Sequence, residues 1–114
     1  MKIIKDQISK HELSSIAEAV GSDLIKAVVD IKRQVMAIGG ELHADEEVLL
    51  LEDGSQQLDL WGINIYPDKD KDDRIEFDSL INIRPYLGNR TRGVDDPKVR
   101  ERIIEIVNKL ITKF

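Results

Sequence analysis

The chain contains no cysteine among its 114 residues, and it has only three prolines and seven glycines. Without cysteine it can form no disulfide, no zinc–thiolate centre and no thiol nucleophile, and a reducing compartment is the simplest setting. So little proline and glycine excludes a low-complexity chain. We therefore expect an ordinary globular protein.

Long hydrophobic runs and an excess of basic residues are also absent. No apolar run approaches the roughly 20 residues that a helix needs to span a bilayer, and residues 1–6 lack the apolar region of a signal peptide. The 22 acidic residues outnumber the 17 basic ones, which gives a net charge of -5. Because a phosphate backbone recruits clustered lysine and arginine, this balance disfavours nucleic acid and membranes as partners. These features predict a cytoplasmic protein.

The apolar pattern predicts one α+β domain over residues 1–114. A chain of this length buries roughly 65% of the surface that its unfolded form exposes, which is enough for a core of its own. We expect a short strand at the N-terminus, a helix over 10–20, strands over 25–31 and 35–38, a helix over 45–52, strands over 60–66 and 75–84, and a helix from 97. The order β-α-β-β-α-β-β-α favours an antiparallel-rich sheet of about five strands with three helices packed on it.

Two helix starts have clear sequence signals. Ser9 and Glu12 have the spacing of a capping box, and Asp96 followed by Pro97 fits an N-cap with proline at the first helical position. The last helix should present one apolar stripe, made by Val99, Ile103, Ile106, Val107, Leu110 and Phe114.

The segment from Gly39 to Glu47 concentrates groups that can do chemistry. If it is extended, Glu41, His43 and Asp45 point to the same side. Such a set suits Mg²⁺ or Mn²⁺ better than catalytic zinc, which rarely has one histidine. The alternative is that Glu41 and His43 are solvated or hydrogen-bonded at a strand end, while the acidic residues that follow complement a helix N-terminus.

A second group of polar residues lies in the loop Gly88–Gly93. Arg90 and Arg92 could hold a carboxylate or phosphate, with Asn89 beside them and Arg84 just upstream. The alternative is that these arginines pair with the protein's own acidic residues.

The outer face of the predicted strands 60–66 and 75–84 carries a third polar set, which lines a cleft or is simply solvated. Its members are Asn64, Glu76, Asp78, Asn82 and Arg84. Trp61, in the same region, is expected to anchor the core.

Four segments carry a resemblance to a known family: Met36–Glu47, Leu60–Pro67, Ile75–Pro85 and Gly88–Gly93. Together they resemble a small prokaryotic family known as domain of unknown function 5674. The resemblance extends over nearly the whole chain and implies a free-standing, single-domain cytosolic protein. It implies no activity, cofactor or catalytic residue.

Three functions remain open from the sequence. The first is binding of a small anionic or polar ligand, or of a protein partner, at a cleft formed by Gly39–Asp45 and Arg84–Arg92. The second is a metal-dependent hydrolase of phosphate esters or related anions, with Glu41, His43 and Asp45 as metal ligands and Arg90 or Arg92 stabilising charge. The third is a structural homodimer without a ligand. The sequence does not decide whether the protein is an enzyme.

Overall fold

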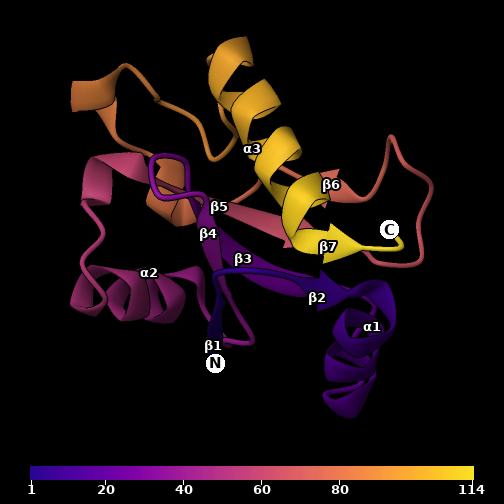
Figure 1. The fold of residues 1–114 in the computed structure, drawn as a ribbon. Coiled ribbons are helices and arrows are strands. Elements are labelled where there is room, and N and C mark those ends of the chain that lie inside the picture. Colours follow the sequence, from indigo (N-terminus) through magenta and orange to yellow (C-terminus); the bar gives the residue numbers. More distant parts are fainter.

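A five-stranded antiparallel sheet lies at the centre of the computed structural model, which describes residues 1–114 (Figure 1). The strand order is β1-β4-β3-β5-β6. These strands are β1 (Lys2–Ile4), β3 (Ile25–Asp30), β4 (Val35–Ile38), β5 (Leu60–Ile65) and β6 (Ile75–Glu76), and the helices are α1 (Lys10–Ala19), α2 (His43–Glu52) and α3 (Pro97–Leu110). The predicted α+β fold with three helices and five antiparallel strands is confirmed.

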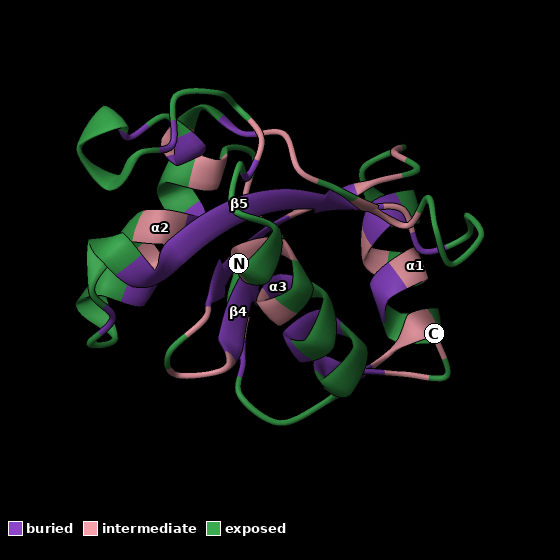
Figure 2. Ribbon diagram, turned by 90° about the horizontal axis from the view of Figure 1, so that it is seen from above, coloured by how far each residue is buried: buried purple, intermediate pink, exposed green.

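The sheet separates two hydrophobic cores. Ala27 pairs with Ile63 on one face and Val28 pairs with Gly62 on the other, so successive side chains of β3 and β5 enter different cores. The larger core lies on the face covered by α1 and α3, and the smaller one lies under α2. Because both faces are covered, β4 and β5 are buried along their whole length (Figure 2).

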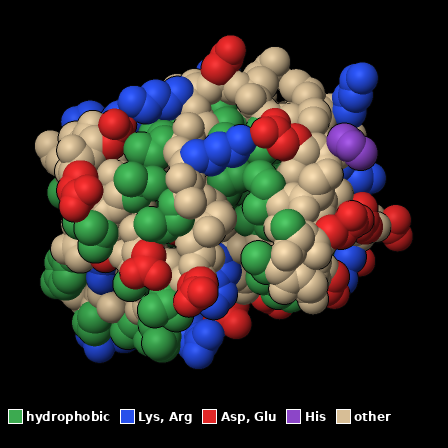
Figure 3. Space-filling model, turned by 90° about the horizontal axis from the view of Figure 1, so that it is seen from below, with side chains coloured by type: hydrophobic (Ala, Val, Ile, Leu, Met, Phe, Trp, Pro, Cys, Tyr) green, Lys and Arg blue, Asp and Glu red, His purple; other side chains and the backbone are tan.

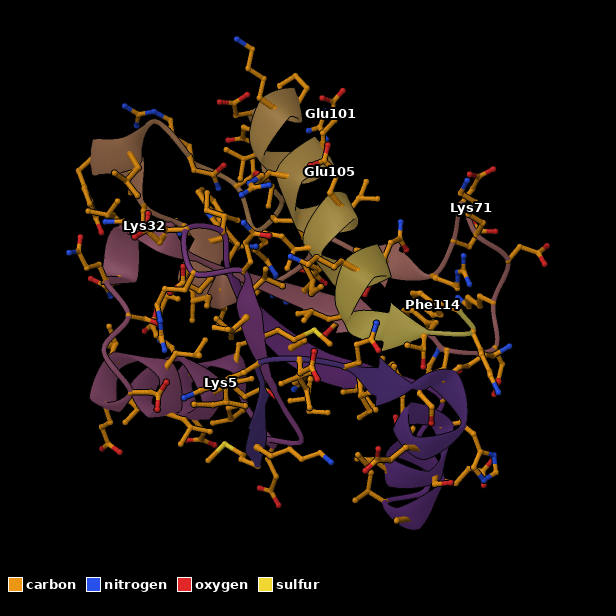
Figure 4. The ribbon with its side chains drawn as sticks, in the orientation of Figure 1. Lys5, Lys32, Lys71, Glu101, Glu105 and Phe114 are labelled. Atoms are coloured by element: carbon orange, nitrogen blue, oxygen red, sulfur yellow. The ribbon has the colours of Figure 1, made fainter.

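Both predicted helix starts are confirmed, but the capping box is half formed, because the Glu12 carboxylate accepts from Lys2 and not from the Ser9 amide. The Ser9 hydroxyl accepts a hydrogen bond from the Glu12 amide at 3.1 Å, and the Asp96 carboxylate accepts one from the Lys98 amide at 2.9 Å. The apolar stripe of α3 packs on the sheet. Glu101 and Glu105 project from the helix into solvent (Figure 4).

The last residues of the chain do not continue the apolar stripe that was predicted for α3. α3 ends at Leu110, and β7 (Ile111–Thr112) then pairs in parallel with β2 (Ile8–Ser9). This small second sheet buries Ile111 next to Ile8, which a further helical turn would not do. Phe114 therefore lies outside the helix, with its ring under the Arg74 guanidinium.

The predicted strand over 75–84 is wrong after its first two residues. The chain leaves the sheet after Glu76 and forms two short 3-10 helices, η2 (Leu80–Asn82) and η3 (Pro85–Leu87). The Asn82 side chain takes the place of the missing strand: its Oδ1 accepts from the Gly62 amide at 2.8 Å and its Nδ2 donates to the Gly62 carbonyl at 2.9 Å. A single side-chain amide thus satisfies both backbone groups of Gly62 at the edge of β5.

Position 62 requires a glycine, because Ser79 at the start of η2 packs directly on its backbone. A Cβ added there would lie 2.5 Å from Ser79 Oγ and 2.6 Å from Ser79 Cβ. We expect Gly62→Ala to lower the free energy of unfolding by about 2 kcal/mol through overpacking. In a Ser79→Gly background the same substitution should have a much smaller effect, with a coupling of at least about 1 kcal/mol in a double-mutant cycle measured by chemical denaturation. Additive effects would contradict this contact.

Candidate functional site

α2 begins earlier than predicted, and this changes the Gly39–Glu47 segment. Leu42 is the extended N-cap and His43 is already helical, so Glu41, His43 and Asp45 do not share one face of a strand. Glu41 and Asp45 are exposed. No group of three histidine, cysteine, aspartate or glutamate residues is arranged to hold a metal ion. The three predicted Mg²⁺ or Mn²⁺ ligands therefore do not come together.

His43 instead borders a cavity of about 250 Å³ between the start of α2, the sheet and η2. The polar side chains that line it come from five separate parts of the chain: Lys26, His43, Asn64, Asp78, Ser79 and Arg92. The segments around His43 and Arg92, which the sequence analysis proposed as two halves of one cleft, thus meet at the same cavity.

Two residues that line the cavity, Lys26 and Asn64, belong to a polar row across three strands. Lys26 of β3 lies opposite Asn64 of β5, which lies opposite Glu76 of β6. Asn64 Nδ2 donates to Glu76 Oε1 at 2.8 Å and to the carbonyl of Asp78 at 3.4 Å, while its Oδ1 has no hydrogen-bond partner. Lys26 Nζ donates to the carbonyl of Glu41 at 2.8 Å.

The His43 ring is held in one tautomer. Its Nε2 lies 2.7 Å from the carbonyl oxygen of Ile63, and since a carbonyl only accepts, Nε2 carries the proton. Burial lowers the pKa of His43, and nearby Lys26 and Arg92 lower it further, although the bond to Ile63 opposes them. The ring is therefore neutral near pH 7, and its Nδ1 is an acceptor without a partner in the protein.

Arg92 is fixed beside the cavity through its backbone and its side chain. Its carbonyl accepts from the Ser79 amide at 2.9 Å and from Asn82 Nδ2 at 2.9 Å. Its Nε donates to Asp78 Oδ1 at 2.6 Å, in an ion pair that is about half exposed. The two terminal nitrogens of the guanidinium have no partner and can bind an anion.

The other residues predicted from the 84–92 region lie away from this cavity. Arg84 is buried, donates to the carbonyls of Gln57 and Leu60, and stacks on the Trp61 ring, which anchors the core as expected. Arg90 is exposed.

Asn89 is also buried and holds its own loop together. Its Nδ2 donates to the carbonyls of Asn82, Thr91 and Gly93, and its Oδ1 accepts from the Asp95 amide. The polar atoms of this side chain are thus fully used within the protein. Asn89 shapes the loop that carries Arg92.

Lys26 was not predicted as a site residue. Its signal was a lysine at the second position of a central strand that is apolar from Ala27 to Val29. Lys26 also borders a second, more apolar cavity of about 290 Å³ beside α1. Basic and acidic side chains are interspersed on the face of the molecule seen from below, where hydrophobic side chains are exposed in a hollow (Figure 3).

The charges at the His43 cavity differ in sign from those of the chain as a whole. Lys26 and Arg92 are cations, Asp78 is the one carboxylate that lines the cavity, and His43 is neutral. The chain overall has a net charge of -5. A local positive excess in a half-buried recess favours anions, since interactions there are less screened than on an open surface.

Comparisons with known proteins identify a family but no characterised relative. No curated protein and no solved structure matches the chain. None of its helices has the length and apolar character needed to cross a membrane. One family model, described as "Protein of unknown function (DUF5674)", matches residues 2–110, and the chain belongs to that family.

Proposed function

We propose that this protein binds a small anionic ligand in the cavity between Lys26 and Arg92. The observation that carries the proposal is that two cations from distant parts of the chain line one recess, although acidic residues outnumber basic ones overall. Neither Asp nor Glu forms an ion pair with Lys26, whose ammonium group is bonded to a backbone carbonyl.

The available donors match a carboxylate or phosphate. Arg92 uses only its Nε for Asp78, so its terminal nitrogens can donate to a ligand oxygen, and Lys26 can add a bond from the opposite side. Hydrogen bonds between charged partners are roughly twice as strong as neutral ones. No observation favours the phosphate-ester hydrolase or the homodimer over this function, and both remain predictions from the sequence.

The test is an NMR titration of the ¹⁵N-labelled protein with two probes, 4-methylpentanoate and inorganic phosphate. We expect the amide signals of residues around His43 and Arg92 to shift with saturable concentration dependence. Arg92→Gln should weaken binding of the bound probe at least tenfold, which corresponds to about 1.4 kcal/mol.

Arg90→Gln is the matched control, because Arg90 lies in the same loop, is exposed and does not line the cavity. Its affinity should equal that of the unmodified protein. The proposal is wrong if neither probe causes saturable shifts, or if Arg90→Gln and Arg92→Gln have the same effect.

A further inference from the structure

The cavity contains hydrogen-bond acceptors that a simple anion cannot satisfy. The Oδ1 of Asn64 has no hydrogen-bond partner, but it is not one of them, because this atom has almost no accessible surface.

Two acceptors of the recess lack partners. The Nδ1 of neutral His43 has no partner, because Nε2 makes the one hydrogen bond of the ring. Asp78 uses only Oδ1 for Arg92 and keeps its second oxygen free. The lining thus offers a carboxylate and one neutral acceptor beside the two cations.

A ligand whose only polar group is a carboxylate supplies acceptors and no donors. It would bind Lys26 and Arg92, but it would leave His43 Nδ1 unpaired and bring a second negative charge close to Asp78. A ligand with an ammonium group next to its carboxylate would meet both kinds of lining atom. The mixture of donors and acceptors therefore selects for a zwitterion.

We propose that the ligand of the Lys26–Arg92 cavity is a free α-amino acid with an apolar side chain, an inference that rests on the proposed function. Its carboxylate binds Lys26 and Arg92, and its ammonium group binds Asp78 and the Nδ1 of His43. Leu42 and Leu80, which also line the cavity, are 57% and 67% exposed and provide apolar surface for the side chain. A cavity of about 250 Å³ accommodates an amino acid of moderate size.

The experiment compares three probes that share one carbon skeleton: leucine, 4-methylpentanoate, which lacks the amino group, and 3-methylbutylamine, which lacks the carboxylate. We expect leucine to bind at least tenfold more tightly than either of the others in NMR titrations or calorimetry. Asp78→Asn should lower the affinity for leucine at least fivefold without lowering the affinity for 4-methylpentanoate. Asp72→Asn, an exposed substitution in the β5–β6 loop, should change neither affinity.

The outcomes separate this inference from the proposed function. If 4-methylpentanoate binds as tightly as leucine and its affinity depends on Arg92, the inference of a zwitterionic ligand is wrong and the proposed anion binding stands. If the amine binds most tightly, or if leucine binds with no dependence on Asp78, the inference is overturned. If 4-methylpentanoate and phosphate both fail to bind, both proposals are wrong.

Discussion

Asn82→Leu should lower the free energy of unfolding by about 3 kcal/mol, because it leaves the buried N–H and carbonyl of Gly62 without partners at about 1–3 kcal/mol each and removes one of the two hydrogen bonds to the Arg92 carbonyl. Asn82 is fully buried. Its amide bonds the N–H and the carbonyl of Gly62 and the carbonyl of Arg92. Leucine has a similar size but offers no hydrogen bond to any of them.

The effect should be visible in both thermal and chemical denaturation. For a chain of this size we expect the melting temperature followed by circular dichroism to fall by more than about 10 °C. Because Asn82 also holds the Arg92 carbonyl, the variant should lose the affinity for 4-methylpentanoate under conditions where it is still folded.

Asn108→Leu is the matched control, since Asn108 is exposed on α3 and undergoes the same chemical change. Its stability should stay within about 0.5 kcal/mol of the unmodified protein. A loss below about 1 kcal/mol for Asn82→Leu would mean that water replaces the amide at the edge of β5.

Periodicity and capping signals predicted most of the fold. The alternation around residues 25–31 and 35–38 gave the central hairpin, and the Ser9 and Asp96 caps fixed two helix starts, because these signals depend on neighbours in the sequence. The family resemblance was also correct, since the family model covers residues 2–110.

The segment after Glu76 could not be predicted by the same means. Its alternating residues satisfy the pattern of a strand, yet Asn82 replaces the strand through contacts with Gly62, twenty residues earlier. A side chain that substitutes for a backbone partner leaves no local periodic signal.

The candidate site was predicted only in part, because it too is formed by contacts between residues that lie far apart in the sequence. The sequence pointed to the segments of His43 and Arg92, which do meet, but it placed Glu41 and Asp45 with His43 because it started α2 too late. Lys26 and Asn64 come together only through the pairing of β3 with β5. The register of β3 against β5 depends on contacts across the whole sheet.

Glu46 should make the protein less stable as the pH rises, an effect that the sequence analysis did not foresee. Its side chain is fully buried under the Gly39–Gly40 turn, where Oε2 accepts from the Gly40 amide at 3.0 Å and Oε1 has no partner. Burial raises the pKa of Glu46 to about 9, although the bond from Gly40 opposes the shift. Glu46 is therefore protonated in the folded protein at neutral pH.

The sign of the effect follows from the protons bound in each state. An unfolded glutamate loses its proton near pH 4.3, whereas folded Glu46 keeps its proton up to a pKa of about 9. Folding therefore takes up a proton between these values, and stability falls by at most about 1.4 kcal/mol for each pH unit in that window. Below the window both states are protonated, and the penalty disappears.

Glu46→Gln removes this titration and keeps a neutral side chain of the same shape. The variant should match the unmodified protein near pH 4.5 and exceed its free energy of unfolding by at least about 2 kcal/mol at pH 8, as measured by guanidinium denaturation across the pH range. Glu52→Gln is the control for removing a carboxylate from the same helix, because Glu52 is exposed and its replacement should change the free energy of unfolding at pH 8 by no more than about 0.5 kcal/mol. A constant difference between Glu46→Gln and the unmodified protein from pH 5 to pH 8 would mean that Glu46 is ionised in the folded state, and that the recess beneath Gly40 carries a negative charge.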